Sequence, residues 1–488
     1  MERNKLTLQQ AQQYEDKMLE KTIAHEKPHF HFCAPIGWIN DPNGFSLYKG
    51  QYHLFYQYHP YSTKWGPMHW GHAKTNDFIK WETLPIALAP DENYDEAGCF
   101  SGSAFEDDGK HVIAYTSVSE YADHDETVVR QTQSIAVGDG IKYVKQPGNP
   151  VIDSSMIPEN CSREDFRDPK IWKENGKYYM LVANRKEDGH GQILKYSSDN
   201  LREWSYVGVL FSSRERIGNM WECPDYFEMD EKKILLISPQ DMMAQELKCH
   251  SGNASIYITT GKDNETFIPQ EMNVLDYGID FYAPQTLRTS DGRRVMIAWM
   301  QTWDVETYPE DFEWHGMMTF PRELRLFQGK IFQNPVKEIE KYWENIVSYK
   351  DAQISGEMQL EGIAGRCMDL AVNITKMECD VLEIQLAKKE ENYISIELDR
   401  NRNRLSFSRR YSQCIRDVVN ERSVDIDCGP KEISLRIIMD LYSVEIFINQ
   451  GEKTITSLFF IDKSFREVMF KTSKGHCVLD VEKRDVQL

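Results

Sequence analysis

The chain lacks the features of a secreted, membrane or nucleic-acid-binding protein. Its first residues contain no apolar segment of the kind that a secretory signal needs, and no run of about 18 apolar residues occurs. Basic charge is also scarce, because 57 Lys and Arg face 77 Asp and Glu, a formal net charge of −20. Nucleic acids and anionic membranes attract basic surfaces. We therefore expect a cytoplasmic protein with no nucleic-acid partner and no membrane partner.

Signals for disulfides and metals are equally weak. The 10 cysteines are scattered without a C-x-x-C pair, which predicts free and mostly buried thiols. His29 and His31 lie close in sequence, as do His69 and His72, but neither pair has the acidic or cysteine neighbours of a known metal site. Structural or substrate-lining roles are favoured for them, and we predict no metal and no other cofactor.

What the chain does have is an internal repeat. At 488 residues it has room for two or three domains, and a hairpin signature recurs with a period of about 60 residues. Each period leaves room for two further strands, and five units of about four strands predict an all-β fold, a five-bladed β-propeller. A β-sandwich with repetitive turns is the alternative. The repeats start at Asp41-Pro42, Ser101-Gly102, Asp168-Pro169, Pro224-Asp225 and Ala283-Pro284.

The pattern of polar and apolar residues changes along the chain and divides it into segments. Residues 1–25 are polar and helix-forming, which predicts a short N-terminal helical extension before the propeller at 26–333. Apolar residues then recur at helical spacing, so residues 334–347 are predicted to form a linker helix. From 348 to 488, short alternating strands with polar turns predict a C-terminal β-sandwich.

Three acids lie one or two residues before a proline at the start of three different repeats. Asp41 follows Asn40, Asp168 lies in Phe-Arg-Asp-Pro, and Glu222 lies in Trp-Glu-Cys-Pro. Because the first strand of each blade lines the channel, these side chains are expected to converge at one mouth. Cleavage of a glycosidic bond needs two carboxylates with separate roles, and a third can hold sugar hydroxyls.

Six motifs in this order closely resemble glycoside hydrolase family 32, the β-fructofuranosidases, over nearly the whole chain. They are Trp38–Gly44, Phe100–Ser103, Phe166–Pro169, Trp221–Pro224, Asp280–Gln285 and Ser443–Phe447. The resemblance implies a propeller followed by a sandwich, in agreement with the repeat count. It also implies a hydrolase of the invertase type that acts on a small sugar.

The resemblance assigns roles residue by residue. Asp41 matches the nucleophile, Glu222 the general acid/base, and Asp168 the carboxylate that stabilises the transition state. Such retaining enzymes place the nucleophile and the acid/base about 5–5.5 Å apart, and the nearby charge of Asp41 is expected to raise the pKa of Glu222. Cys223 is interpreted as a packing residue. The expected substrate-binding residues are Trp38, Asn40, Gln57, Trp65, Phe100, Ser101, Arg167 and Trp299.

Several alternatives remain open at this point. The substrate can be sucrose, sucrose 6-phosphate or a short fructo-oligosaccharide, and recognition of a phosphate would require basic residues such as Lys64, Arg185 or Lys186. Transfructosylation would use the same residues as hydrolysis. A catalytically inactive fructan-binding or sugar-sensing module is a further alternative, although a pure binder has no need of an acid/base. The oligomeric state is not predicted.

Overall fold

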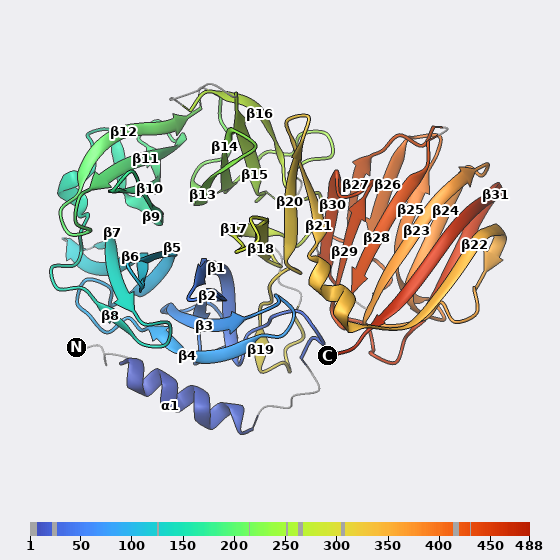
Figure 1. Ribbon diagram of the computed structural model, residues 1–488, viewed down its shortest axis with the longest axis horizontal. Coiled ribbons are helices and arrows are strands. Elements are labelled where there is room, and N and C mark those ends of the chain that lie inside the picture. The colour runs from blue at the N-terminus through green and yellow to red at the C-terminus, as the bar shows by residue number, and fades with distance from the viewer. Residues whose placement is uncertain are drawn as a thin grey trace.

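Five antiparallel sheets surround a central axis in a computed structural model that describes residues 7–21, 27–123, 126–213, 215–249, 252–261, 267–303, 308–412, 419–429 and 431–488 (Figure 1). Blade 1 contains β1 (Gly37–Tyr48), β2 (Gln51–His59), β3 (His69–Thr75) and β4 (Glu82–Leu88). Blade 2 contains β5 (Gly98–Asp107), β6 (Lys110–Asp123), β7 (Glu126–Gly138) and β8 (Tyr143–Lys145). Blade 3 contains β9 (Cys161–Glu174), β10 (Lys177–Lys186), β11 (Gly191–Ser198) and β12 (Ser205–Ser212), and a 3₁₀ turn at Ser154–Met156 precedes it.

The last two blades complete the ring. Blade 4 contains β13 (Trp221–Met229), β14 (Lys232–Pro239), β15 (Ile256–Thr260) and β16 (Pro269–Val274). Blade 5 contains β17 (Tyr282–Arg288), β18 (Arg294–Trp299), β20 (Arg322–Phe327) and β21 (Lys330–Pro335). The short strand β19 (Trp314–His315) leaves blade 5 and pairs in parallel with β1, so the end of the ring is hydrogen-bonded to its beginning. The predicted five-bladed propeller is confirmed.

A β-bulge interrupts the innermost strand of every blade at the same relative position. One extra residue enters the ladder at Asp41 in β1, Ser101 in β5, Asp168 in β9, Cys223 in β13 and Ala283 in β17. Three of these residues have left-handed backbones, with φ of 64° at Asp168, 49° at Cys223 and 51° at Ala283. A proline follows four of the five residues. Proline is tolerated there because the bulge breaks the ladder that would otherwise need its N–H.

The N-terminal helix α1 (Leu8–Leu19) packs on the outer side of blade 1 (Figure 1). It begins with a capping box, in which Thr7 accepts a hydrogen bond from the backbone N–H of Gln10 and the Gln10 side chain accepts one from that of Thr7. Its inner face buries Ala11 and Glu15, and the Tyr58 hydroxyl donates to Glu15 Oε1 at 2.7 Å. The helix is therefore joined to the propeller by a buried hydrogen bond as well as by apolar contact.

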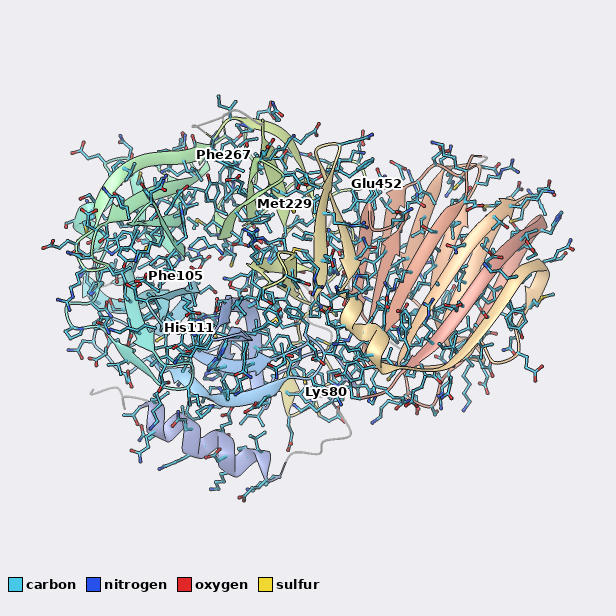
Figure 2. All side chains as sticks on the ribbon, in the orientation of Figure 1. Lys80, Phe105, His111, Met229, Phe267 and Glu452 are labelled. Carbon is cyan, nitrogen blue, oxygen red and sulfur yellow. The ribbon has the colours of Figure 1, made fainter. Side chains whose placement is uncertain are left out.

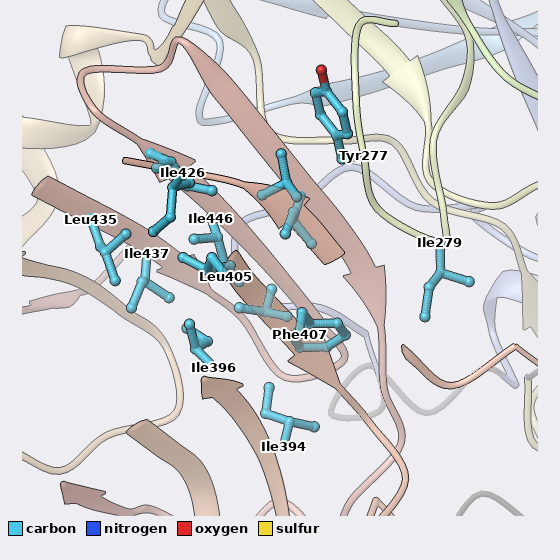
Figure 3. Packing of buried hydrophobic residues seen from close by; sticks show 14 of the residues in the cluster. Tyr277, Ile279, Ile394, Ile396, Leu405, Phe407, Ile426, Leu435, Ile437 and Ile446 are labelled. Atoms are coloured by element: carbon cyan, nitrogen blue, oxygen red, sulfur yellow. The ribbon is translucent and has the colours of Figure 1, made fainter. Parts of the chain in front are cut away.

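The C-terminal domain is a two-layered β structure in which one long strand belongs to both layers. β31 (Glu467–Val486) pairs through its first half with β24 and through its second half with β23, while β22 runs along it. A buried aliphatic core fills the space between the layers, and Tyr277 and Ile279 of the propeller lie beside it (Figure 3). The remaining strands, in chain order, are β22 (Trp343–Met358), β23 (Met368–Met377), β24 (Val381–Lys389), β25 (Asn392–Asp399), β26 (Arg404–Ser408), β27 (Glu421–Asp425), β28 (Ile433–Met439), β29 (Ser443–Ile448) and β30 (Lys453–Leu458).

The connection between the domains differs from the predicted linker helix at 334–347. Only Lys337–Tyr342 is helical, as a 3₁₀ segment, and β22 already begins at Trp343. The apolar residues at helical spacing do not form one buried face, since Ile339 is buried in the 3₁₀ segment while Ile346 is exposed on β22. Pairing with β31 overrides the local helical pattern here.

A buried ionic cluster joins the two domains. Glu445 on β29 accepts hydrogen bonds from His31 Nε2 at 2.9 Å, from the Phe320 backbone N–H at 2.6 Å and from Arg322 Nε at 2.9 Å. The Arg322 and Glu445 side chains have 0% exposed surface. Burial disfavours a charged His31, yet its hydrogen bonds to Asp440 and Glu445 raise its pKa to about 9. These contacts tie the entry of the propeller and its fifth blade to the sandwich.

Glu445→Gln is expected to lower the apparent free energy of unfolding by about 3 kcal/mol, because it removes one of the two buried carboxylates that contact Arg322 and one of the two that contact His31. The loss should be constant between about pH 4.5 and 6.5 and should shrink as pH rises through about 9, where wild-type His31 loses its proton. Denaturant titrations across this pH range measure the loss in the free energy of unfolding. The exposed change Glu432→Gln in the same domain is the control, and an equal effect of both changes would contradict the prediction.

Candidate active site

The bulges of blades 1, 3 and 4 bring three carboxylates to one mouth of the channel. Asp41, Asp168 and Glu222 lie on the innermost strands β1, β9 and β13, and their exposed fractions are 8%, 5% and 9%. All three are thus nearly buried but still reached by solvent. The predicted convergence of these acids follows from the bulges, which turn side chains out of the regular alternation of a strand.

Cys223 is the residue that links the acids. Its thiol lies 3.4 Å from Asp41 Oδ2 and 3.6 Å from Asp168 Oδ2, and its backbone N–H donates to Asp168 Oδ2 at 2.9 Å. Burial and then the charge of Asp168 raise the pKa of this thiol well above its usual range, so it stays protonated and serves as a donor. The interpretation of Cys223 as a packing residue is therefore incomplete, because it also hydrogen-bonds both carboxylates.

A single guanidinium holds Glu222 from one side. Arg167 Nε donates to Glu222 Oε1 at 3.0 Å, while Arg167 Nη1 donates to Asp165 Oδ1 at 2.9 Å. Asp165 in turn pairs with Arg185 Nη2 at 2.6 Å, and the Arg185 side chain is 41% exposed. An alternating chain of charges therefore runs from the solvent to the predicted acid/base.

A tyrosine holds the other oxygen of Glu222. The Tyr282 hydroxyl lies 2.7 Å from Glu222 Oε2 and 2.8 Å from the carbonyl oxygen of Ser238. The sequence reasoning included Tyr282 only as part of the Asp280–Gln285 motif and did not assign it a role. Its position immediately before the bulge at Ala283, equivalent to that of Glu222 before Cys223, was the signal that could have identified it.

The electrostatics of the site raise the pKa of two of the acids, Asp41 and Asp168. Burial and then the neighbouring Glu222 raise the pKa of Asp41 to about 6, although hydrogen bonds from Ser101, Asn40 and Cys223 oppose the shift. Burial and Glu222 likewise raise the pKa of Asp168 to about 7. Asp41 and Asp168 therefore readily keep a proton near neutrality.

Several predicted substrate-binding residues lie directly around the acids. Ser101 Oγ donates to Asp41 Oδ2 at 2.6 Å, which fixes the predicted nucleophile. Trp38 Nε1 donates to Asn40 Oδ1 at 3.0 Å on the same strand. Gln57 on β2 is 2% exposed, and its amide donates to the Cys99 carbonyl at 3.0 Å. These side chains are held rigidly before any ligand arrives.

The predicted aromatic residues differ in their exposure. Trp65 is 50% exposed, and its ring lies edge-on to Phe100 at 6.0 Å, so both can offer a face to a sugar. Trp299 has 0% exposed surface and packs between Trp38 at 6.0 Å and Trp303 at 5.0 Å. Trp299 therefore supports the wall of the site, and a direct contact between it and the substrate remains a prediction.

Within the described ranges, no group of three or more His, Cys, Asp or Glu side chains is arranged to hold a metal ion. The histidine pairs of the sequence have other contacts. His31 joins the interdomain cluster, and His72 Nε2 lies 2.9 Å from His53 Nδ1 inside blade 1. Among the helices of those ranges, none has the length and apolar character needed to span a membrane.

Comparison with known proteins decides the family. Residues 31–335 match the N-terminal domain of glycosyl hydrolases family 32, and residues 338–486 match the C-terminal domain of the same family. The chain belongs to glycosyl hydrolase family 32. The resemblance inferred from the six motifs is thereby confirmed, and so is the expectation of an invertase-like, fructoside-cleaving hydrolase.

Relatives with known names cover almost the entire chain. A sucrose-6-phosphate hydrolase of Zymomonas mobilis is 35% identical over 94% of this chain and 91% of its own length. The raffinose invertase of Escherichia coli is 33% identical over 93% of both chains. Among solved structures, the GH32 beta-fructofuranosidase of Bombyx mori in complex with sucrose is 31% identical, covers 99% of both chains and has a TM-score of 0.84.

The pKa of Asp41 predicts the acid side of the pH profile. A carboxylate nucleophile must be ionised, so kcat/KM for sucrose should fall about tenfold per pH unit below about pH 6. Ser101→Ala removes a hydrogen bond that stabilises the ionised form, and it should move this fall to higher pH. The control is Ser103→Ala, whose hydroxyl donates to the Pro169 carbonyl. An unmoved profile in Ser101→Ala would contradict the assignment of this limb to Asp41.

Proposed function

We propose that the protein is a retaining β-fructofuranosidase that releases a terminal fructosyl unit by double displacement. The observation that carries the proposal is the pairing of Asp41 and Asp168 through the Cys223 thiol, beside a Glu222 whose two oxygens are held by Arg167 and Tyr282. Two carboxyl groups in different surroundings are what the retaining mechanism needs. The separation of about 5–5.5 Å between Asp41 and Glu222 remains a prediction.

In the first step Asp41 attacks the anomeric C2 of the fructosyl unit. Its Oδ2 atom is held by Ser101 and Cys223, which orient the carboxylate for the attack. The bond between C2 and the glycosidic oxygen breaks as the new bond forms.

Glu222 gives its proton to the leaving oxygen, and Tyr282 supports both of its protonation states. When Glu222 is protonated, it can donate to the Tyr282 oxygen while the tyrosine hydroxyl donates to the Ser238 carbonyl. When Glu222 is ionised, the hydroxyl turns and donates to the carboxylate, which Arg167 also stabilises. The deprotonated Glu222 then activates the water that releases fructose. The cycle needs no metal and no cofactor.

Asp168 remains beside the sugar as the stabilising carboxylate. It accepts a hydrogen bond from the Cys223 backbone, and its own backbone N–H donates to Thr116 Oγ1 at 2.9 Å. These bonds hold its strained backbone in place, so that a carboxylate oxygen faces the sugar hydroxyls. Hydrogen bonds to this acid strengthen as positive charge develops on the ring.

We propose that the substrate is sucrose or sucrose 6-phosphate and that the enzyme acts in the cytoplasm. Several relatives are named sucrose-6-phosphate hydrolase, among them proteins of Zymomonas mobilis and Escherichia coli. Because Glu222 protonates the leaving group, the glucosyl unit lies on its side of the site, toward the Asp165–Arg185 pair. Arg185 is thus favoured over Lys186, which pairs with Asp188 at 3.2 Å, as the residue that contacts a phosphate.

Asp41→Asn and Glu222→Gln should each lower kcat for sucrose by at least about a thousandfold, because each removes one of the two groups that take part in bond breaking. Released fructose and glucose are quantified with purified protein. Asp199→Asn, an exposed change of the same type in blade 3, is the control. Substantial turnover by either active-site variant, with the fold intact by circular dichroism, would refute the mechanism and favour a different acid pair.

Arg185→Gln should raise KM for sucrose 6-phosphate about tenfold and leave KM for sucrose within about twofold, because only the phosphorylated substrate loses a charge-assisted contact. Parallel assays with sucrose, sucrose 6-phosphate and 1-kestose measure this difference. Lys186→Gln, one residue away, is the matched control. Equal effects on the phosphorylated and unphosphorylated substrates would show that Arg185 acts only through Asp165.

A further inference from the structure

The channel has a second mouth, and this mouth opens into a separate cavity. A hollow of about 610 Å³ is lined by the C-terminal ends of the innermost strands of all five blades, beginning at Phe45 on β1 and including Phe105 on β5, which Figure 2 labels. Phe45 lies four residues after Asp41, and at about 3.3 Å per residue the near edge of the cavity is about 13 Å along the strand from the predicted nucleophile. It does not belong to the active site.

Basic residues gather at this mouth although the chain as a whole is acidic. The lining contains Lys170, Lys173, Lys195, Lys233, Arg288 and Arg294, whereas the net charge of the chain is −20. Two of the six are neutralised locally, because Lys170 pairs with Asp225 and Lys173 with Asp107. The lining carboxylates are Glu106, Glu174 and Glu228. The first accepts from the Lys49 backbone and the second from the Trp172 indole N–H.

Two arginines face the cavity as a like-charged pair. Arg288 on β17 is directly opposite Arg294 on β18, an arrangement that is unfavourable in an antiparallel ladder. Neither guanidinium is within ion-pair distance of a carboxylate in the described parts of the chain. Arg294 instead lies 4.5 Å from the centre of the Phe227 ring. Burial lowers the pKa of Arg294, the nearby charge of Asp225 opposes this shift, and the charge of Arg288 adds to it. An anion between the two arginines would reduce their mutual repulsion.

Aromatic side chains provide a second type of surface beside these charges. The Trp172 ring lies 5.4 Å from Tyr226 and stacks on Tyr179 at 5.5 Å, and Lys195 Nζ lies 4.4 Å from the centre of the Tyr179 ring. Trp172 and Tyr226 are partly exposed and line the cavity. A sugar ring packs on such flat apolar faces, while a phosphate is bound by paired guanidinium groups.

We propose that this cavity binds a phosphorylated sugar, with the phosphate between Arg288 and Arg294 and the sugar against Trp172 and Tyr226. The size of the cavity falls in the range of small-molecule sites. The phosphate would give both guanidinium groups an anion at direct ion-pair distance. The site does not depend on the catalytic assignment, because no hydrogen bond or ion pair among the described residues joins its lining to Asp41, Asp168 or Glu222.

Isothermal titration calorimetry with glucose 6-phosphate as the probe tests the proposal. The Arg288→Gln/Arg294→Gln double variant should bind the probe at least about tenfold more weakly than the wild type, and added salt should weaken wild-type binding. Glucose and inorganic phosphate, titrated separately, should each bind more weakly than glucose 6-phosphate. The variant Arg410→Gln, an exposed arginine of the sandwich, should bind like the wild type.

A second variant separates this site from the active site, which can also accept a sugar phosphate. Binding at the far mouth should persist in Arg185→Gln, whose change lies at the catalytic mouth. Binding lost in Arg185→Gln but kept in the double variant would overturn the proposal, as would no binding to the wild type. Inorganic phosphate binding as tightly as glucose 6-phosphate would overturn the role of the aromatic surface. Circular dichroism and thermal melting confirm that the double variant is folded.

Discussion

The bulge repeated in the innermost strand of each blade is the constraint on which the rest of this structure depends. In a regular strand, successive side chains would point alternately into the channel and into the space between the blades. A given functional group would then face only one of these two spaces. The extra residue re-aims the side chains at one height around the ring, at Asp41, Ser101, Asp168, Cys223 and Ala283. The left-handed backbones at three of these positions are strained, so the neighbouring blades have to hold them.

The bulges place three carboxyl groups at nearly buried positions, and the surrounding residues offset the cost of burying them. Arg167 supplies a positive charge, and it is shared between Glu222 and Asp165. The Cys223 thiol and the Ser101 hydroxyl donate to Asp41, while the Cys223 backbone donates to Asp168. A group of acids arranged in this way readily exchanges protons near neutral pH, which is the property that glycoside cleavage uses.

The sandwich is attached through charges rather than only through apolar packing. Glu445 and Asp280, both in motifs shared with the family, have no place in the catalytic group. Glu445 holds Arg322 and His31, and Asp280 pairs with Arg409 of the sandwich at 2.8 Å. Because Asp280 lies two residues before Tyr282, the domain contact also positions the strand that supports Glu222. A sequence motif shared with the family can therefore consist of residues at the domain interface that holds the active site in place.

The sequence by itself determined the repeat, the number of blades, the three acids and the family, because each depends on local patterns that recur in the chain. It did not determine the short connection at Lys337–Tyr342, where pairing with β31 overrides a helical spacing. Nor could it show that Cys223 bonds two acids or that Tyr282 contacts Glu222. Those contacts join residues of different strands or blades. Their distances are set only when the ring closes, since no local pattern records which side chains will meet across it.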